Sequence, residues 1–289
     1  MKWLFAPQPR GRIAALRTIA YLFIPVDVLL TTSWVAKHAD VPGSLYRPLY
    51  VGRLLHLPAP GPVSVRLVMA LLLGCAFAAA TGRLPRLLGA AVAVLYAWWM
   101  VVAMSYGKVD HDRFAFLVLL AVLPTVGPAR QGDGTEDESS GWALRCIQLA
   151  VVATYFLAAV AKFRFGGFDW ATGATLSRAI LRRGTFASRP LLSVRWLLVA
   201  MQFAMIGFEL ASPLLLRGGR VTKRFVLFLY AFHAASFVGI GIVFLPHLVA
   251  LLAFVPLERG AAIVAARLRP WRRTFGPFAQ SPAAVHNRS

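Results

Sequence analysis

Residues 146–173 read CIQLAVVATYFLAAVAKFRFGGFDWATG, an apolar run that predicts a helix ending on Lys162 and entering a Gly-Gly turn. On a helix, Gln148, Tyr155 and Lys162 recur every seven residues and therefore share one face. A polar face that ends in an ammonium is costly in hydrocarbon, so we expect it to look into protein or a water-filled cavity. The alternative is that Lys162 extends to the lipid headgroups and only helps to end the helix.

Apolar runs of similar length recur along the whole chain, and 58% of its 289 residues are hydrophobic. This pattern predicts an all-α, polytopic transmembrane helical bundle with about eight spans and interfacial amphipathic helices. The division expected is a basic cytoplasmic N-terminus (1–12), a transmembrane domain (13–258) and a basic tail (259–289), interfacial and then disordered. The predicted spans are 13–36, 64–81, 84–106, 111–127, 142–162, 194–216, 225–243 and 245–257. The loop 37–62 and the basic segment 163–193 are expected to lie along the membrane surface.

The charge of the chain is strongly positive, with 31 Lys and Arg against 11 Asp and Glu. The arginines gather at the ends of apolar runs and in the tail, which favours anionic lipids as partners over nucleic acid. The two cysteines, Cys75 and Cys146, lie inside apolar runs, so neither a disulfide framework nor a cysteine-based metal site is expected. The sequence also lacks HExxH, CxxC and GxGxxG motifs, and we expect no bound metal.

Two acidic residues fall inside predicted spans. Ionised groups at mid-membrane cost about 2.5–3.5 kcal/mol each on insertion scales, so they should be paired or neutral. For Asp27 we expect Lys162 or an arginine near the outer surface as the partner. Glu209 is expected to be a buried structural acid bonded to a neighbouring span, or to be protonated.

Two histidines stand out in the same way. If the N-terminus is cytoplasmic, His111 begins one span and Lys162 ends the next on the outer side, so both should reach one cavity, with His233 entering from below. The alternatives are that His111 is an ordinary loop end and that His233 makes a structural hydrogen bond between helices.

Several segments of the sequence, taken together and in order, resemble the HTTM domain, the membrane part of vitamin K-dependent γ-glutamyl carboxylases and of their bacterial relatives. The resemblance extends over residues 12–258. The segments that carry it are YRPLYVGRLLH from Tyr46, HDRFAFLVLL from His111, QLAVVATYFLAAVAK ending at Lys162, WATG from Trp170, ELASP from Glu209, and FHAASFVGIGIVF around His233.

The resemblance implies a catalytic role for three residues. Lys162 stands where these carboxylases carry the lysine thought to deprotonate vitamin K hydroquinone, which then takes up O₂ and becomes the base that removes a glutamate γ-proton before CO₂ is captured. His111 corresponds to a histidine that helps to stabilise reactive intermediates, and His233 aligns with another histidine of the family. A lysine can serve as such a base near neutral pH only where its surroundings favour the neutral amine.

The implied cofactor is a reduced quinone resembling vitamin K hydroquinone, and we expect Tyr155, Gln148 and Trp170 to bind it. The family's carboxylases have a long extramembrane C-terminal region that holds the protein substrate, and this chain ends soon after its last predicted span. We therefore expect a carboxylase-like lyase, if the protein is an enzyme, acting by quinol- and O₂-dependent carboxylation or oxygenation on a small or lipidic substrate.

Two other functions stay open. One is a non-enzymatic membrane accessory protein for the maturation or export of a partner, which would have a docking surface and could meet a peptide. The other is a transporter, which would favour discontinuous helices or inverted repeats; neither is evident in the sequence.

The distribution of basic residues predicts the topology in the cell membrane. Lys and Arg gather in residues 1–12, 83–86, 217–224 and the tail, whereas the turn at 246–247 has none. By the positive-inside rule both termini and the acidic segment 128–141 should be cytoplasmic, with 37–62 outside. The basic segment 163–193 is the main exception, because it falls outside.

Single-cysteine labelling in intact cells, with Cys75 and Cys146 replaced, tests this topology. A cysteine at Thr135 should resist an impermeant reagent, and one in the 37–62 loop should react. Labelling at position 135 would overturn the assignment.

Overall fold

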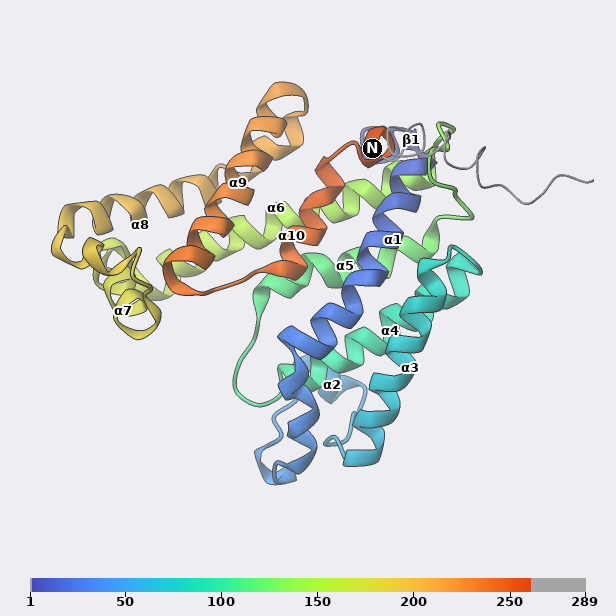
Figure 1. Cartoon of the computed structure of the whole chain (residues 1–289), viewed down its shortest axis with the longest axis horizontal. Coiled ribbons are helices and arrows are strands. Elements are labelled where there is room, and N and C mark those ends of the chain that lie inside the picture. Colours follow the sequence, from blue (N-terminus) through green and yellow to red (C-terminus); the bar gives the residue numbers. More distant parts are fainter. Residues whose placement is uncertain (1, 261–289) are drawn as a thin grey trace, which may run out of the picture.

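The computed structural model describes residues 2–260, and in this range the chain folds almost entirely into helices (Figure 1). Five of them are long and apolar enough to cross a membrane. This confirms the all-α class and is compatible with the predicted membrane location. The five are α1 (Arg10–Val26, continued by the π-helical η1, Asp27–Thr31), α3 (Pro62–Ala80), α4 (Pro85–Ala103), α6 (Glu138–Gly166) and α9 (Gly219–Ile240).

The other three predicted spans are shorter helices. Proline lacks the amide hydrogen that an α-helix needs, and Pro124 follows α5, Pro213 follows α8, and Pro246 opens α10. The chain adopts 3₁₀ turns after each of these helices, so eight spans stay a prediction. Their bounds are α5 (Phe114–Val122), η5 (Leu123–Thr125), α8 (Arg195–Leu210), η8 (Ser212–Arg217), α10 (Leu245–Leu251) and η9 (Leu252–Phe254).

The segments expected at the membrane surface form short helices. The expected helix within 163–193 is the ten-residue α7 (Ala174–Arg183), since α6 runs on to Gly166. The loop 37–62 contains the short α2 (Tyr50–Leu54). Beyond Gly260, the predicted tail lies outside the described residues. The remaining 3₁₀ turns are η2 (Ser33–Asp40), η3 (Gly43–Leu45), η4 (His111–Arg113), η6 (Phe168–Ala171) and η7 (Arg189–Ser193).

The long helix α6 connects two groups of helices. In Figure 1, α1, α3 and α4 lie together on one side, and α7, α8 and α9 lie on the other. α6 packs against α5, α10 and α8, and its contact with α8 includes Lys162 near its C-terminal end. Side chains placed along one face of α6 can therefore meet different elements.

Ionic contacts hold the N-terminus against the start of α6 and the end of the described chain. The two-residue strands β1 (Gln8–Pro9) and β2 (Glu136–Asp137) pair in antiparallel fashion. Arg10 contacts Asp137 at 3.2 Å, and Arg12 bonds both carboxylate oxygens of Glu258 at 2.8 Å. Hydrogen bonds from Ser139, from the Ser140 amide and from Arg10 lower the pKa of Asp137 to about 2, so this cap of α6 stays ionised at neutral pH.

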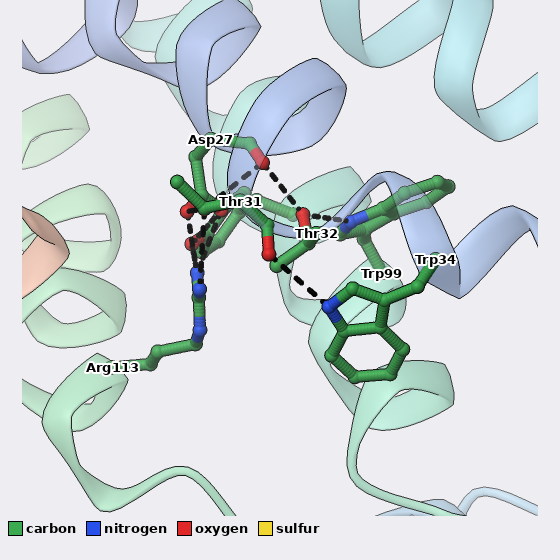
Figure 2. A network of polar contacts seen from close by, with 7 residues as sticks. Asp27, Thr31, Thr32, Trp34, Trp99 and Arg113 are labelled. Carbon is green, nitrogen blue, oxygen red and sulfur yellow. Dashed lines mark hydrogen bonds and ion pairs between the residues drawn. The ribbon is translucent and has the colours of Figure 1, made fainter. Parts of the chain in front are cut away.

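A buried ion pair joins α1 to the start of α5 (Figure 2). Asp27 is fully buried, and Arg113 Nη1 lies 2.7 Å from both of its carboxylate oxygens. The hydroxyls of Tyr96 and Thr31 also donate to the Asp27 carboxylate, the first at 2.9 Å. Of the partners expected for Asp27, the structure shows an arginine and not Lys162.

The backbone beside this carboxylate is fixed by two tryptophans. Trp99 donates to the Thr32 hydroxyl at 3.0 Å, and that hydroxyl donates to the Asp27 carbonyl at 2.9 Å (Figure 2). Trp34 donates to the Thr31 carbonyl at 3.1 Å. The carbonyls at both ends of this π-helical turn therefore accept side-chain hydrogen bonds, and the Asp27 carbonyl also accepts from the Thr32 amide.

We predict that Asp27→Asn destabilises the protein, because it leaves the Arg113 guanidinium buried without a counter-charge. Breaking one side of a buried pair typically costs about 3–5 kcal/mol. Thermal unfolding of the detergent-purified protein should show a clear drop in midpoint for Asp27→Asn. The double variant Asp27→Leu/Arg113→Met, which removes both charges, should recover much of it. Equal midpoints for the wild type and Asp27→Asn would contradict this role.

Candidate functional site

The polar face of α6 is bonded to three different elements. Gln148 Nε2 donates to the carbonyl of Ala253 in η9 at 2.9 Å. The Tyr155 hydroxyl lies 2.7 Å from Nε2 of His233 in α9. Lys162 Nζ lies 2.6 Å from both carboxylate oxygens of Glu209 in α8. The prediction that this face looks into protein is confirmed, and each of its members has a partner.

Lys162 and Glu209 form a largely buried ion pair, with side chains 18% and 9% exposed. Both carboxylate oxygens accept from the ammonium, so the geometry fits the ionised form of Glu209 and not an isolated protonated acid. This excludes the alternative in which Lys162 merely extends to lipid headgroups. Glu209 is the buried acid bonded to a neighbouring helix that its sequence context predicted.

The indole of Trp170 covers the ammonium, with its ring centre 5.2 Å from Lys162 Nζ. Gln202 of α8 donates to the Trp170 carbonyl and so fastens η6 to α8. A cation over an aromatic face is stabilised by the ring quadrupole. α8 therefore supplies both the counter-charge of Lys162 and the contact that positions its aromatic cover.

His111 and Lys162 line one cavity of about 610 Å³, which we call the lysine cavity. The volume lies within the range of about 300–1,000 Å³ usual for small-molecule sites. The hydroxyl of Thr154 is already used, since it donates to the Ala150 carbonyl at 2.8 Å. The side chains that can offer polar contacts to a ligand in this cavity are therefore Lys162, His111 and Trp170. The remaining lining residues are Phe114, Ala153, Leu157, Ala158, Ala161, Phe165 and Gly166.

Three predicted site residues do not line this cavity. The expectation that His233 enters it from below is wrong, because His233 is buried against Tyr155. Tyr155 and Gln148, expected at a cofactor, likewise point to partners in α9 and η9. The heptad spacing correctly predicted that Gln148, Tyr155 and Lys162 share one face of α6. Each of them, however, bonds to a different element: η9, α9 and α8.

Sequence reasoning missed His247, which is almost completely buried at the start of α10. Its ring lies 4.7 Å from that of Tyr155 and 6.0 Å from that of His233. Neither ring nitrogen of His247 has a partner among the described residues, and Nδ1 of His233 also lacks one. The turn expected at residues 246–247 is instead the first turn of α10, and the position of His247 in an apolar run is the signal in the sequence that could have identified it.

Arg17 is a second buried group that the sequence did not single out. It donates to the carbonyls of Leu123, Val126 and Gly127 at the end of η5, at 2.8 Å for Leu123 and 2.9 Å for Gly127. The Leu123 carbonyl also accepts from the Val126 amide at 3.3 Å, so Arg17 adds hydrogen bonds where α5 and η5 end. Arg17 therefore stabilises the end of α5 opposite to His111 and has no direct part in the lysine cavity.

No protein-family model, curated protein or solved structure matches the chain. The resemblance to the HTTM domain therefore stays a prediction. Among the described residues, no group of three or more His, Cys, Asp and Glu side chains is placed to hold a metal ion. The site combines the Lys162–Glu209 ion pair with the aromatic face of Trp170, and His111 lines the same cavity as Lys162.

We predict that Glu209→Gln lowers the thermal unfolding midpoint, because an amide cannot neutralise the partly buried ammonium. The double variant Lys162→Met/Glu209→Leu, which removes both charges, should be more stable than Glu209→Gln alone. Lys108→Met is a suitable control, since Lys108 is mostly exposed and its pair with Asp110 should contribute little. A Glu209→Gln variant as stable as this control would show that the pair does not hold α8 to α6.

Proposed function

We propose that the chain is an integral membrane protein whose lysine cavity binds a lipid-soluble, weakly acidic molecule, with a reduced quinone as the class that fits best. The observation that carries this proposal is that Lys162, paired with Glu209 behind it, lines a mostly apolar cavity that His111 also lines. Such a cavity combines an apolar volume with a few convergent polar groups, as small-molecule sites do.

The walls suit an aromatic ring that carries a hydroxyl. Trp170, Phe114 and Phe165 offer aromatic surface, and Lys162 and His111 offer polar contacts for the hydroxyl. Phe114, Leu157 and Phe165 line the cavity and are also strongly exposed, Phe165 at 82%. In a bilayer these side chains would face hydrocarbon, which supports entry of a lipid-soluble ligand from the side.

Glu209 explains how a lysine that is paired in the free protein could still accept a proton. Lys162 Nζ lies 2.6 Å from both carboxylate oxygens of Glu209, so a proton can pass directly between the two groups. If the proton moves from Lys162 to Glu209, the amine can take the proton of a bound hydroxyl. Lys162 is then the base, Glu209 holds the displaced proton, and His111 faces the developing anion.

The resemblance to the HTTM domain favours a carboxylase-like reaction within this scheme. A bound quinol would supply the reducing, O₂-dependent chemistry, and the chain's own residues would orient it and accept its proton. The substrate proposed is small or lipidic. The topology proposed is the one with cytoplasmic termini, which places the lysine cavity toward the outer leaflet.

The test is mass spectrometry of lipids and quinones that are extracted together with the purified protein. We predict a quinone-type compound enriched over the membrane from which the wild type is purified, present near one per chain, and lost in Lys162→Met/Glu209→Leu. Lys108→Met should retain it. If no quinone is enriched and a second protein is purified instead, the accessory function is the better account.

A further inference from the structure

A second cavity, of about 410 Å³, lies between α7, α8 and α9, and we call it the apolar cavity. Met205 and Phe208 of α8, Phe232 of α9 and Ile180 of α7 are among the residues that line it. The hydroxyls of its two serines are occupied, because Ser188 donates to the Gly239 carbonyl at 2.6 Å and Ser236 to the Phe232 carbonyl at 3.0 Å. The cavity therefore offers apolar contact and no free side-chain hydroxyl.

Arginines lie close in sequence to the lining residues of α7 and of the turn that follows it. Arg182 and Arg183 follow the lining residue Ile180, and Arg189 follows the lining residue Ser188. These arginines are exposed, and within residues 2–260 none forms an ion pair. Asp169 is the only acidic residue between positions 163 and 208. The local charge is strongly positive and uncompensated.

Exposed aromatic side chains flank the same arginines. Phe186 is 91% exposed and Trp196 is 71% exposed. Aromatic residues beside arginines are typical of segments at the level of the lipid headgroups, where an apolar ring and a charged group can each find a suitable environment. The segment that supplies the α7 side of the apolar cavity thus has the composition typical of headgroup level, and Phe228 and Phe232 of α9 also line the cavity.

The geometry points to a binding site for one anionic phospholipid, with an acyl chain in the apolar cavity and its phosphate held by Arg182, Arg183 and Arg189. In a bilayer, an apolar cavity cannot select among lipids by hydrophobicity, because all their chains are equally apolar. Selection must come from the headgroup, and a guanidinium binds phosphate oxygens in a paired, planar geometry. This site is independent of the function proposed for the lysine cavity.

The site would also bear on α8. Phe208 lines the apolar cavity, and its neighbour Glu209 holds Lys162 on another face of the same helix. A chain filling the apolar cavity would pack against α8 from that side. Bound lipid should therefore raise the stability of the helix that positions the lysine cavity.

The test uses the full chain, delipidated in detergent, and titrated with phosphatidylglycerol or phosphatidylcholine of the same acyl chains. Native mass spectrometry should show one phosphatidylglycerol bound at least tenfold more tightly than phosphatidylcholine. Arg182→Gln/Arg183→Gln should lose this preference, whereas Arg220→Gln/Arg224→Gln, an exposed basic pair at the start of α9, should keep it. Equal binding of the two lipids by the wild type would overturn the proposal.

The acyl-chain part is tested by filling the cavity. Ala235→Trp places a large side chain into the lining and should abolish binding of both lipids, whereas the adjacent Ala234→Trp, exposed and outside the lining, should not. If Ala235→Trp fails to fold, the smaller Ala204→Leu in the same lining serves instead. Glycerol phosphate that binds as tightly as the full lipid would overturn the acyl-chain assignment and leave only a phosphate site.

Discussion

Buried charges that need a partner on another helix constrain this structure more than any other feature. Apolar helices surrounded by hydrocarbon gain little from burying apolar surface against one another, so their orientation depends on packing and on polar contacts. Lys162 of α6 and Glu209 of α8 meet this need for one pair of helices, and Asp27 and Arg113 meet it for another. A one-residue rotation of α6 would take Lys162 away from its carboxylate, so the pair fixes the helix face as well as the contact.

The two ion pairs differ in what surrounds them. The Asp27 carboxylate is fully buried and accepts hydrogen bonds from Arg113, Tyr96 and Thr31 (Figure 2). Its oxygens are therefore bonded within the protein. The Lys162 ammonium has one carboxylate, an aromatic cover and an open cavity on its remaining side. A closed network stabilises a single arrangement, whereas a pair beside a cavity can exchange its proton with a ligand. This difference is the physical reason why the first pair is structural, and why we propose a chemical role for the second.

The sequence carries the local part of this arrangement. Helical periodicity places Gln148, Tyr155 and Lys162 on one face, and the alternation of span direction brings His111 and Lys162 to one end of the bundle. The sequence does not predict which residue pairs with Asp27, because any cation at the same depth could do so. Tertiary packing brings Arg113 to it. Hydropathy did not reveal that α5, α8 and α10 are short, because it averages over the 3₁₀ turns that end these helices. Both cavities arise from packing between distant segments, which no periodicity along the chain reports.

α8 is the element through which these features meet. Its successive side chains Phe208 and Glu209 point to different neighbours, one lining the apolar cavity and the other holding Lys162. Gln202, two turns earlier, holds the Trp170 carbonyl and so sets the aromatic cover of the ammonium. With only 16 residues and a 3₁₀ turn after it, α8 depends on these side-chain contacts for its position. Any ligand or lipid that shifts α8 along its axis would change the distance between Glu209 and Lys162, and with it the ability of the pair to exchange a proton.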